Sequence, residues 1–400
     1  TGEAAAGPRA PINVALVLDR SGSMQGGPLA AAKAAARRFA GFLAGGDRLS
    51  VVAFDDEVRT LFGPAPAGDP AAAEAIERVQ AGGSTNLSGG WLKGLQHVQA
   101  GLVDGVNRVV LLTDGQANAG VTDVHQLVAM AQAGHGKRIS TTCIGFGAHF
   151  NERLLEPMAR QGGGNYWYVE RDDQMAGIFE EEIEGLVALA AQNVELEVTL
   201  THPRAAGVTF LQSLPVETTP QGTWRVVLGD LYATSPKALG LLFHVEEVRE
   251  LGQVEVARVR IEADVVTAAG IEHRTIVMPV VANLDGADHP EPVVEQTFLR
   301  FEAARAREEA VRRADHGDFD GAAACLRTVA ETIAAAPYEA DASVAEEVAD
   351  LRAQAERLEE RRYSALDRKY DSARAMASRE MKEAYLRKMS RRPRPGGRAE

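Results

Sequence analysis

Two kinds of hydrophobic pattern alternate along the first half of the chain. Short continuous apolar runs are typical of strands buried on both faces, and segments with apolar residues at helical spacing separate them. The runs fall at residues 12–19, 49–54, 108–113, 139–146 and 166–169, with a shorter edge strand at 58–62. The helical segments fall at 28–43, 70–79, 88–102, 122–133, 151–160 and 172–190. This alternation predicts an α/β fold with a doubly wound, mostly parallel sheet over residues 11–190.

The period of the pattern changes after residue 190. Val194, Leu196 and Val198 alternate with polar residues, which indicates a strand with one buried face. Further runs occur at 223–228, 238–245, 254–265 and 275–281, between turns that contain glycine or proline. We therefore expect an antiparallel β-sandwich over residues 191–294.

The last quarter of the chain has a helical composition. Residues 295–390 are rich in Ala, Glu and Arg and poor in β-branched residues, which favours helices, with breaks near Gly317 and Pro337. Residues 391–400 are basic and contain proline and glycine, so we expect a disordered basic tail. The predicted order is an α/β domain, a sandwich, a helical region and a tail.

The charge balance limits the classes of partner. The chain has 43 Lys and Arg against 56 Asp and Glu, a formal net charge of −13. Such a surface repels nucleic acid and anionic membranes, so we expect no nucleic-acid partner. No apolar run approaches the ~18 residues that a membrane span needs. The two cysteines, Cys143 and Cys325, lie far apart, which disfavours a disulfide framework and is typical of a reducing, cytoplasmic location.

Polar side chains follow the first predicted strand in the order Asp19-Arg20-Ser21-Gly22-Ser23. The carboxyl edge of an open α/β sheet is where ligands bind. One carboxylate and two hydroxyls supply hard oxygen donors, which suit Mg²⁺. Taken alone, the pattern has two interpretations, because serines here are equally suited to capping the next helix.

Two further strand-end loops carry oxygen donors. Thr85 lies in a Gly-Gly-Ser-Thr-Asn segment before a predicted helix, and Asp114 follows a strand that ends in Leu-Leu-Thr. The series V-L-D-R-S-G-S-M, G-G-S-T-N-L and L-L-T-D-G resembles the von Willebrand factor type A domain with its metal-ion-dependent adhesion site. The later I-G-F-G, N-E-R-L-L and G-G-G-N-Y segments resemble the bacterial stand-alone or chloride-channel-like members. The resemblance covers about residues 11–190.

The resemblance implies a Rossmann-like domain and a five-residue metal site made of Asp19, Ser21, Ser23, Thr85 and Asp114. By similarity, the three hydroxyls bind Mg²⁺, or Mn²⁺ or Ca²⁺, directly, and the two carboxylates act largely through bound waters. A Glu or Asp carboxylate of a partner protein would complete the coordination shell. The implied function is metal-dependent protein binding, as an adhesion or scaffold module, with no catalytic residues and no organic cofactor.

The resemblance also implies that the helix at 172–190 shifts when a ligand binds. Its apolar positions are expected to face the sheet: Met175, Ile178, Phe179, Ile183, Leu186 and Val187. Its glutamates are expected to lie mostly in solvent: Glu180, Glu181, Glu182 and Glu184. A helix docked rigidly on the sheet is the alternative.

Three other functions stay open. Asp19 with Mg²⁺ could act as the nucleophile of a phosphohydrolase, but Ser21 stands where such enzymes carry an acid/base carboxylate. The resemblance also allows an accessory subunit of an AAA+ ATPase, as some bacterial type A proteins are, and the chain has no Walker motif of its own. It could also be a structural subunit in which the metal only stabilises the fold.

Overall fold

The computed structural model describes residues 10–147, 149–212, 214, 216–233, 237–246, 252–267, 270–284, 291–336, 342–380, 382 and 385–386. Contacts divide the chain into two compact units. The first unit comprises Thr1–Leu196, Val227–Thr234 and Ile261–Ile276. The second comprises Glu197–Val226, Ser235–Arg260 and Val277–Glu400. That residues 11–190, 191–294 and 295–390 fold as separate domains stays a prediction.

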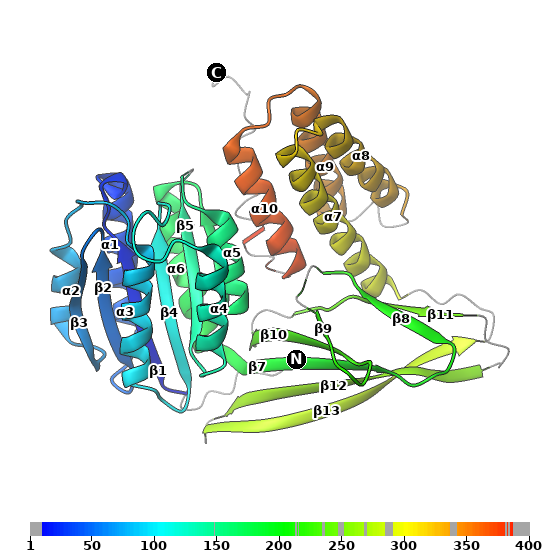
Figure 1. The fold of residues 1–400 in the computed structure, drawn as a ribbon, viewed down its shortest axis with the longest axis horizontal. Helices are drawn as coiled ribbons and strands as arrows, with labels where there is room; N and C mark the ends of the chain where they lie inside the picture. Colours follow the sequence, from blue (N-terminus) through cyan, green and yellow to red (C-terminus); the bar gives the residue numbers. More distant parts are fainter. Residues whose placement is uncertain are drawn as a thin grey trace. The chain divides into compact units, whose positions relative to one another are not determined.

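The first unit contains a six-stranded sheet with the order β3-β2-β1-β4-β5-β6 (Figure 1). Its strands are β1 (Ile12–Asp19), β2 (Arg48–Phe54), β3 (Val58–Pro66), β4 (Val106–Thr113), β5 (Ser140–Phe146) and β6 (Gly163–Val169). All neighbouring strands are parallel except β2 and β3. β1, β4 and β5 are buried along their whole length, as continuous apolar runs predict. The predicted doubly wound sheet is confirmed.

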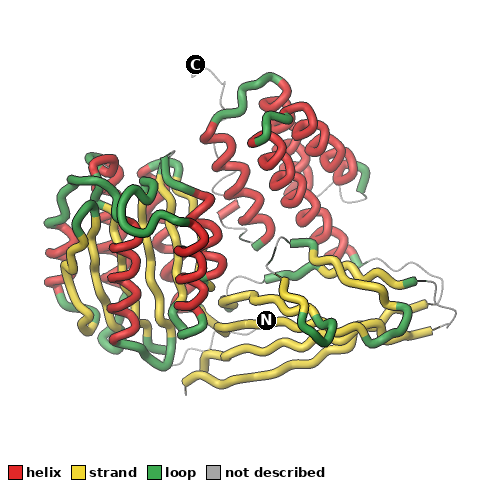
Figure 2. The backbone as a smooth tube through the Cα atoms, viewed as in Figure 1, coloured by secondary structure: helices red, strands yellow, loops and turns green. Residues whose placement is uncertain are grey.

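Helices cover both faces of this sheet (Figure 2). They are α1 (Gly27–Phe42), α2 (Pro70–Glu77), α3 (Leu87–Ala100), α4 (Val124–His135), α5 (Glu152–Gln161) and α6 (Asp172–Val187), with a short 3-10 helix η1 (Gly22–Met24). From β1 the chain first moves to β2 on one side, and later to β4, β5 and β6 on the other side. Because such crossovers are right-handed, the two directions place α1 on one face of the sheet and α3, α4 and α5 on the other. α6 packs against α1, where the rings of Phe39 and Phe179 meet edge to face with centroids 6.2 Å apart.

Two glycines let α3 lie close to the sheet. A Cβ atom at Gly90 would lie 2.5 Å from the ring of Phe54, and one at Gly94 would lie 2.5 Å from Cγ2 of Val17. Both distances are well below van der Waals contact. The start of α3, with the Thr85 loop before it, is therefore held against the carboxyl ends of β1 and β2.

The strands that follow α6 form antiparallel sheets, as the change of period predicts. They are β7 (Leu189–Leu200), β8 (Ala205–Phe210), β9 (Val216–Thr218), β10 (Trp224–Tyr232), β11 (Leu241–Val245), β12 (Gly252–Thr267) and β13 (Gly270–Leu284). One sheet has the order β13-β12-β7-β10-β9, and β11 pairs with β8 in the other. β8 and β9 were not predicted, because both are short and neither has a buried face.

The described helices after β13 are α7 (Pro292–Asp315), α8 (Phe319–Ala334), α9 (Ala342–Glu359) and α10 (Ala365–Arg379). The break near Gly317 is confirmed, whereas Pro337 and residues 391–400 lie outside the described residues. Apolar side chains of α7, α8 and α9 share one core. None of the helices in the described ranges is both long and apolar enough to cross a membrane.

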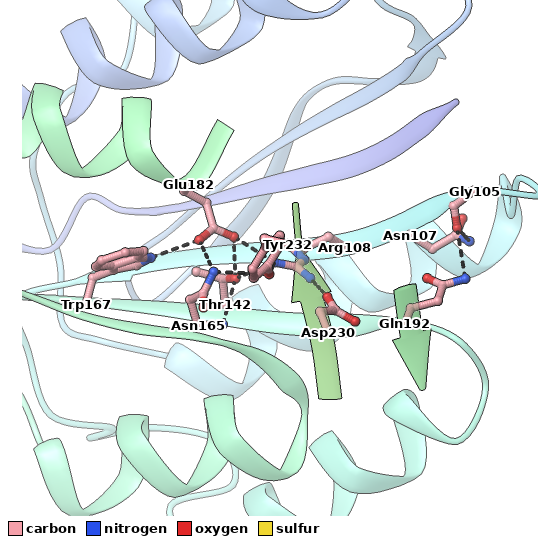
Figure 3. A network of polar contacts seen from close by, with 10 residues as sticks. All are labelled: Gly105, Asn107, Arg108, Thr142, Asn165, Trp167, Glu182, Gln192, Asp230 and Tyr232. Carbon is pink, nitrogen blue, oxygen red and sulfur yellow. Dashed lines mark hydrogen bonds and ion pairs between the residues drawn. The ribbon is translucent and has the colours of Figure 1, made fainter. Parts of the chain in front are cut away.

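A network of buried polar side chains fixes β10 to the α/β sheet within the first unit (Figure 3). Arg108 of β4 is 1% exposed. Its Nη1 donates to Oε1 of Glu182 on α6 at 2.9 Å and to the hydroxyl of Tyr232 at 3.1 Å. Its Nη2 pairs with the carboxylate of Asp230. Tyr232 and Asp230 both belong to β10, so a strand distant in sequence is held at the start of β4.

The expectation that Glu182 lies in solvent is wrong. Its side chain is fully buried and accepts hydrogen bonds from Thr142 Oγ1 at 2.6 Å, Asn165 Nδ2 at 2.8 Å and Trp167 Nε1 at 2.9 Å (Figure 3). Burial alone would raise the pKa of Glu182, but Arg108 and these three donors hold it below its usual value. The sequence predicted Val187 in the buried stripe instead, and its side chain is 47% exposed.

Candidate metal centre

A buried carboxylate lies at the carboxyl edge of the sheet, where β1 and β4 run parallel as neighbours. Asp19, the last residue of β1, is 0% exposed. Its Oδ1 accepts a hydrogen bond from the backbone N–H of Ser21 at 2.8 Å, and its Oδ2 accepts one from Thr113 Oγ1 at 2.5 Å. Because Thr113 is the last residue of β4, Asp19 ties the loop after β1 to the end of the neighbouring strand.

Two serine hydroxyls and a second carboxylate continue the cluster. Ser23 Oγ donates to Asp114 Oδ1 at 2.8 Å, and the hydroxyl oxygens of Ser21 and Ser23 lie 3.2 Å apart. Ser21 makes no capping bond to η1, and the residue that caps α1 is Gly26. The two serines therefore point into the cluster, and their alternative role as caps of the next helix is not observed.

Thr85 reaches the same edge from the third loop. Its side chain is buried, and its Oγ1 lies 3.0 Å from the position of a Cβ atom at Gly115, the residue after Asp114. The carbonyl oxygen of Thr85 accepts hydrogen bonds from the backbone N–H groups of Asn118 at 3.1 Å and Ala119 at 3.3 Å. These two bonds join the loop after β4 to the Thr85 loop. All five predicted residues lie in three adjacent loops at one edge.

The donor set fits a hard divalent cation. Two carboxylates and three hydroxyls offer only oxygen, which suits Mg²⁺, Mn²⁺ or Ca²⁺ and not the nitrogen and sulfur ligands typical of zinc. Across the described ranges, no group of three or more His, Cys, Asp or Glu side chains could hold a metal ion. An ion at this edge would therefore need the hydroxyls of Ser21, Ser23 and Thr85 as well as the carboxylates.

Both carboxylates are poorly stabilised as anions. Burial raises the pKa of Asp19 to about 6, although hydrogen bonds from Thr113 and Ser21 oppose the shift. Burial also raises the pKa of Asp114, against the hydrogen bond from Ser23. A cation between the two would favour their charged forms, so the electrostatics of the cluster favour metal binding.

Affinity for Mn²⁺ is expected to fall as the pH decreases through about 6, because the ion must displace the proton of Asp19. Below that pH the loss should approach about tenfold per pH unit, and above about pH 7 the affinity should level off. Calorimetric titration of the full chain with MnCl₂ at several pH values between 5 and 8 measures this. A flat profile would contradict the role of Asp19.

Sequence reasoning missed Thr113 as a member of the site. Its Oγ1 donates to Asp19 and accepts the backbone N–H of Gly115 at 3.1 Å, so Thr113 contacts both the end of β1 and the loop after β4. The signal was present, since a threonine at the end of a fully buried strand needs a hydrogen-bond partner nearby.

Residues 13–181 match the family model described as the von Willebrand factor type A domain. An uncharacterized protein of Synechocystis sp. is 29% identical over 336 residues, which cover 81% of this chain and 79% of that protein. Inter-alpha-trypsin inhibitor heavy chain H1 of Bos taurus is 28% identical over 204 residues, or 48% of this chain. Those residues span only 22% of the bovine protein.

Two solved structures share the fold over most of the chain. A von Willebrand factor type A structure from Catenulispora acidiphila matches with a TM-score of 0.66 and 20% identity, over 84% of this chain and 82% of that one. The ArnB paralog VWA2 from Sulfolobus acidocaldarius matches with a TM-score of 0.52 and 14% identity, over 95% and 90% of the two chains. At these identities the similarity concerns the fold.

Proposed function

Because residues 13–181 form a von Willebrand factor type A domain, we propose that this chain binds a partner protein through a divalent cation. Mg²⁺ is the expected ion, with Mn²⁺ and Ca²⁺ as alternatives, held by Asp19, Ser21, Ser23, Thr85 and Asp114. A Glu or Asp carboxylate of the partner would complete the shell. The domain would then act as an adhesion or scaffold module and not as an enzyme.

The observation that carries this proposal is the bonded cluster of Asp19, Ser21, Ser23 and Asp114 at the edge of the sheet. The three groups expected to contact the ion directly are neutral hydroxyls, and the two carboxylates are expected to act largely through bound waters, so the ion would stay electron-poor. When bound, the ion supplies an electron-poor position that attracts an outside carboxylate. The protein side chains hold that position at the surface end of a buried strand, where a partner can reach it.

The phosphohydrolase alternative is disfavoured by the environment of Asp19. A nucleophilic carboxylate needs a free oxygen facing the substrate. Here the side chain is fully buried and both oxygens accept hydrogen bonds. Mg²⁺-dependent hydrolysis of an aryl phosphate that Asp19→Asn abolishes would overturn the binding proposal.

Affinity capture from native lysate tests the proposal. The wild-type chain in Mg²⁺ is expected to retain a partner that is lost in EDTA and with Ser21→Ala/Ser23→Ala protein. Ser50→Ala is a matched control, since Ser50 is a buried serine inside β2, away from the metal loops.

Other results of the capture would point elsewhere. A partner retained equally in EDTA and by the double variant would favour the structural-subunit alternative. An ATPase among the retained proteins would identify the chain as an AAA+ accessory subunit.

A further inference from the structure

A buried aspartate outside the predicted ligand set lies between the loop that carries Ser21 and Ser23 and the loop that carries Thr85. Asp55 directly follows β2 and is 4% exposed. Its backbone N–H donates to the carbonyl of Glu57 at 3.0 Å, and its Oδ1 accepts the N–H of Glu57 at 2.9 Å. These two bonds fix the turn after β2, so the carboxylate of Asp55 has a defined position.

The side chain of Asp55 holds the loop after β1. Its Oδ1 accepts a hydrogen bond from Nη2 of Arg20 at 2.7 Å, and Arg20 stands between Asp19 and Ser21 in the metal motif. The backbone N–H of Arg20 donates to the carbonyl of Phe54 at 2.8 Å, on the residue before Asp55. The guanidinium is mostly buried, so this ion pair is less screened than a surface pair.

The backbone of Asp55 holds the Thr85 loop. Its carbonyl accepts the N–H of Asn86 at 2.7 Å, directly after Thr85. A Cβ atom at Gly83 would overlap Oδ1 of Asp56 and lie 2.9 Å from Cγ of Asp55, so this loop packs against both aspartates. Gly83 has a φ of +59°, which favours glycine, and its carbonyl accepts the N–H of Gly22 in the first loop at 3.1 Å.

We propose that Asp55 is a positioning residue for the metal centre. It sets the distance between the loop that carries Ser21 and Ser23 and the loop that carries Thr85, so that hydroxyls from both can share one cation. This inference rests on the proposed function. Groups behind metal ligands typically change affinity 10–100-fold when they are replaced, and we expect an effect of that size here.

Calorimetric titration of the full chain with MnCl₂ tests the inference. Asp55→Asn is expected to weaken Mn²⁺ binding by about 10–100-fold. Asp47→Asn is the matched control, because Asp47 is a buried aspartate at the opposite end of β2 and accepts the N–H groups of Ile12 at 2.9 Å and Ala44 at 2.7 Å. That control should lower the unfolding midpoint and leave Mn²⁺ affinity within about twofold of wild type.

A double-mutant cycle with Thr85→Ala separates positioning from general destabilisation. If Asp55 acts by setting the distance between the Ser21 and Ser23 loop and the Thr85 loop, Asp55→Asn should change affinity little once the Thr85 hydroxyl is gone. Additive losses in the cycle would overturn the inference.

Asp55→Asn would leave the positive charge of Arg20 unpaired near the cation, and that charge would itself weaken Mn²⁺ binding. Arg20→Met removes this charge and so separates its effect from positioning. The positioning role predicts that Arg20→Met also weakens Mn²⁺ binding. Stronger Mn²⁺ binding by Arg20→Met would overturn the positioning role. Wild-type affinity in the Arg20→Met/Asp55→Asn chain would also overturn it. Equal affinities of wild type and Asp55→Asn would do the same. Arg20→Met also serves if Asp55→Asn fails to fold. A wild-type chain that binds no Mn²⁺ would instead overturn the proposed function, and this inference with it.

Discussion

Replacing Arg108 by methionine is expected to destabilise the first unit by about 3–5 kcal/mol. The substitution keeps much of the volume of the side chain but leaves the carboxylates of Glu182 and Asp230 without the guanidinium between them. Both carboxylates are almost completely buried, at 0% and 3% exposure of the side chain, so solvent does not replace the lost partner. Urea unfolding, followed by tryptophan fluorescence, to which Trp167 of the same network contributes, measures the change.

The pH dependence of this variant gives a second check. Without Arg108, the two buried carboxylates should have raised pKa values, so the destabilisation should decrease as the pH falls and both groups take up protons. Glu182→Gln added to Arg108→Met should recover part of the lost stability, because it removes one unpaired charge. Arg138→Met, which removes an exposed pair with Asp104, is the control and should change stability by less than about 0.5 kcal/mol. A similar small effect for Arg108→Met would contradict the structural role of the network.

Replacing Asp19 by asparagine is expected to affect metal binding and stability in opposite directions. Loss of the carboxylate should weaken Mn²⁺ binding by about 10–100-fold. In EDTA at pH 7, however, the variant should be more stable than wild type by about 1–3 kcal/mol. The reason is that the folded state raises the pKa of Asp19 from 3.8 to about 6, so wild-type stability falls as the pH rises through this range and asparagine avoids that loss.

Two measurements check this prediction. Calorimetry with MnCl₂ gives the affinities, and urea unfolding in EDTA at pH 7 and at pH 4 gives the stabilities. The stability difference should decrease towards pH 4, where Asp19 of the wild type is protonated in the folded state. Equal heats of Mn²⁺ binding for both proteins would refute the metal site. An Asp19→Asn chain less stable than wild type at pH 7 would contradict the raised pKa of Asp19 in the folded state.

The positions of four candidate ligands, Asp19, Ser21, Ser23 and Asp114, could be predicted because they lie at or directly after the ends of β1 and β4. Continuous apolar runs identify β1 and β4, and parallel neighbours end at the same edge of a sheet, so Asp19 and Asp114 had to lie close together. Thr85 could be added only through the resemblance to a family, since no periodic signal specifies which hydroxyl of its loop faces the cluster.

Glu182 could not be placed by residue type, but its spacing contained the information. It lies four residues after Ile178 and four before Leu186, and both of these side chains are buried on α6. Glutamate is almost never buried without a partner, and its partners here are 74, 40 and 17 residues away, at Arg108, Thr142 and Asn165. The spacing within α6 therefore indicates that Glu182 is buried, but it does not identify these distant partners.

The same contacts bear on the expected shift of α6. Movement of this helix along the sheet would break the hydrogen bonds that Glu182 accepts from β4, β5 and β6. The backbone N–H of Ala233, after β10, also donates to the carbonyl of Ala188 at the end of α6, at 2.8 Å. These bonds favour the alternative in which α6 is docked rigidly.

The network around Arg108 also constrains how related chains can diverge. A neutral residue at position 108 is tolerable only if positions 182 and 230 lose their charges as well, although they are 74 and 122 residues away in the sequence. Intermediates with one or two replacements would pass through a destabilised protein, so the three positions should be exchanged as a set or retained together. The pair 108 and 230 reaches beyond residues 13–181, the segment that matches the family model. Substitutions at position 108 of the α/β sheet are therefore expected to depend on the residue at position 230 of β10.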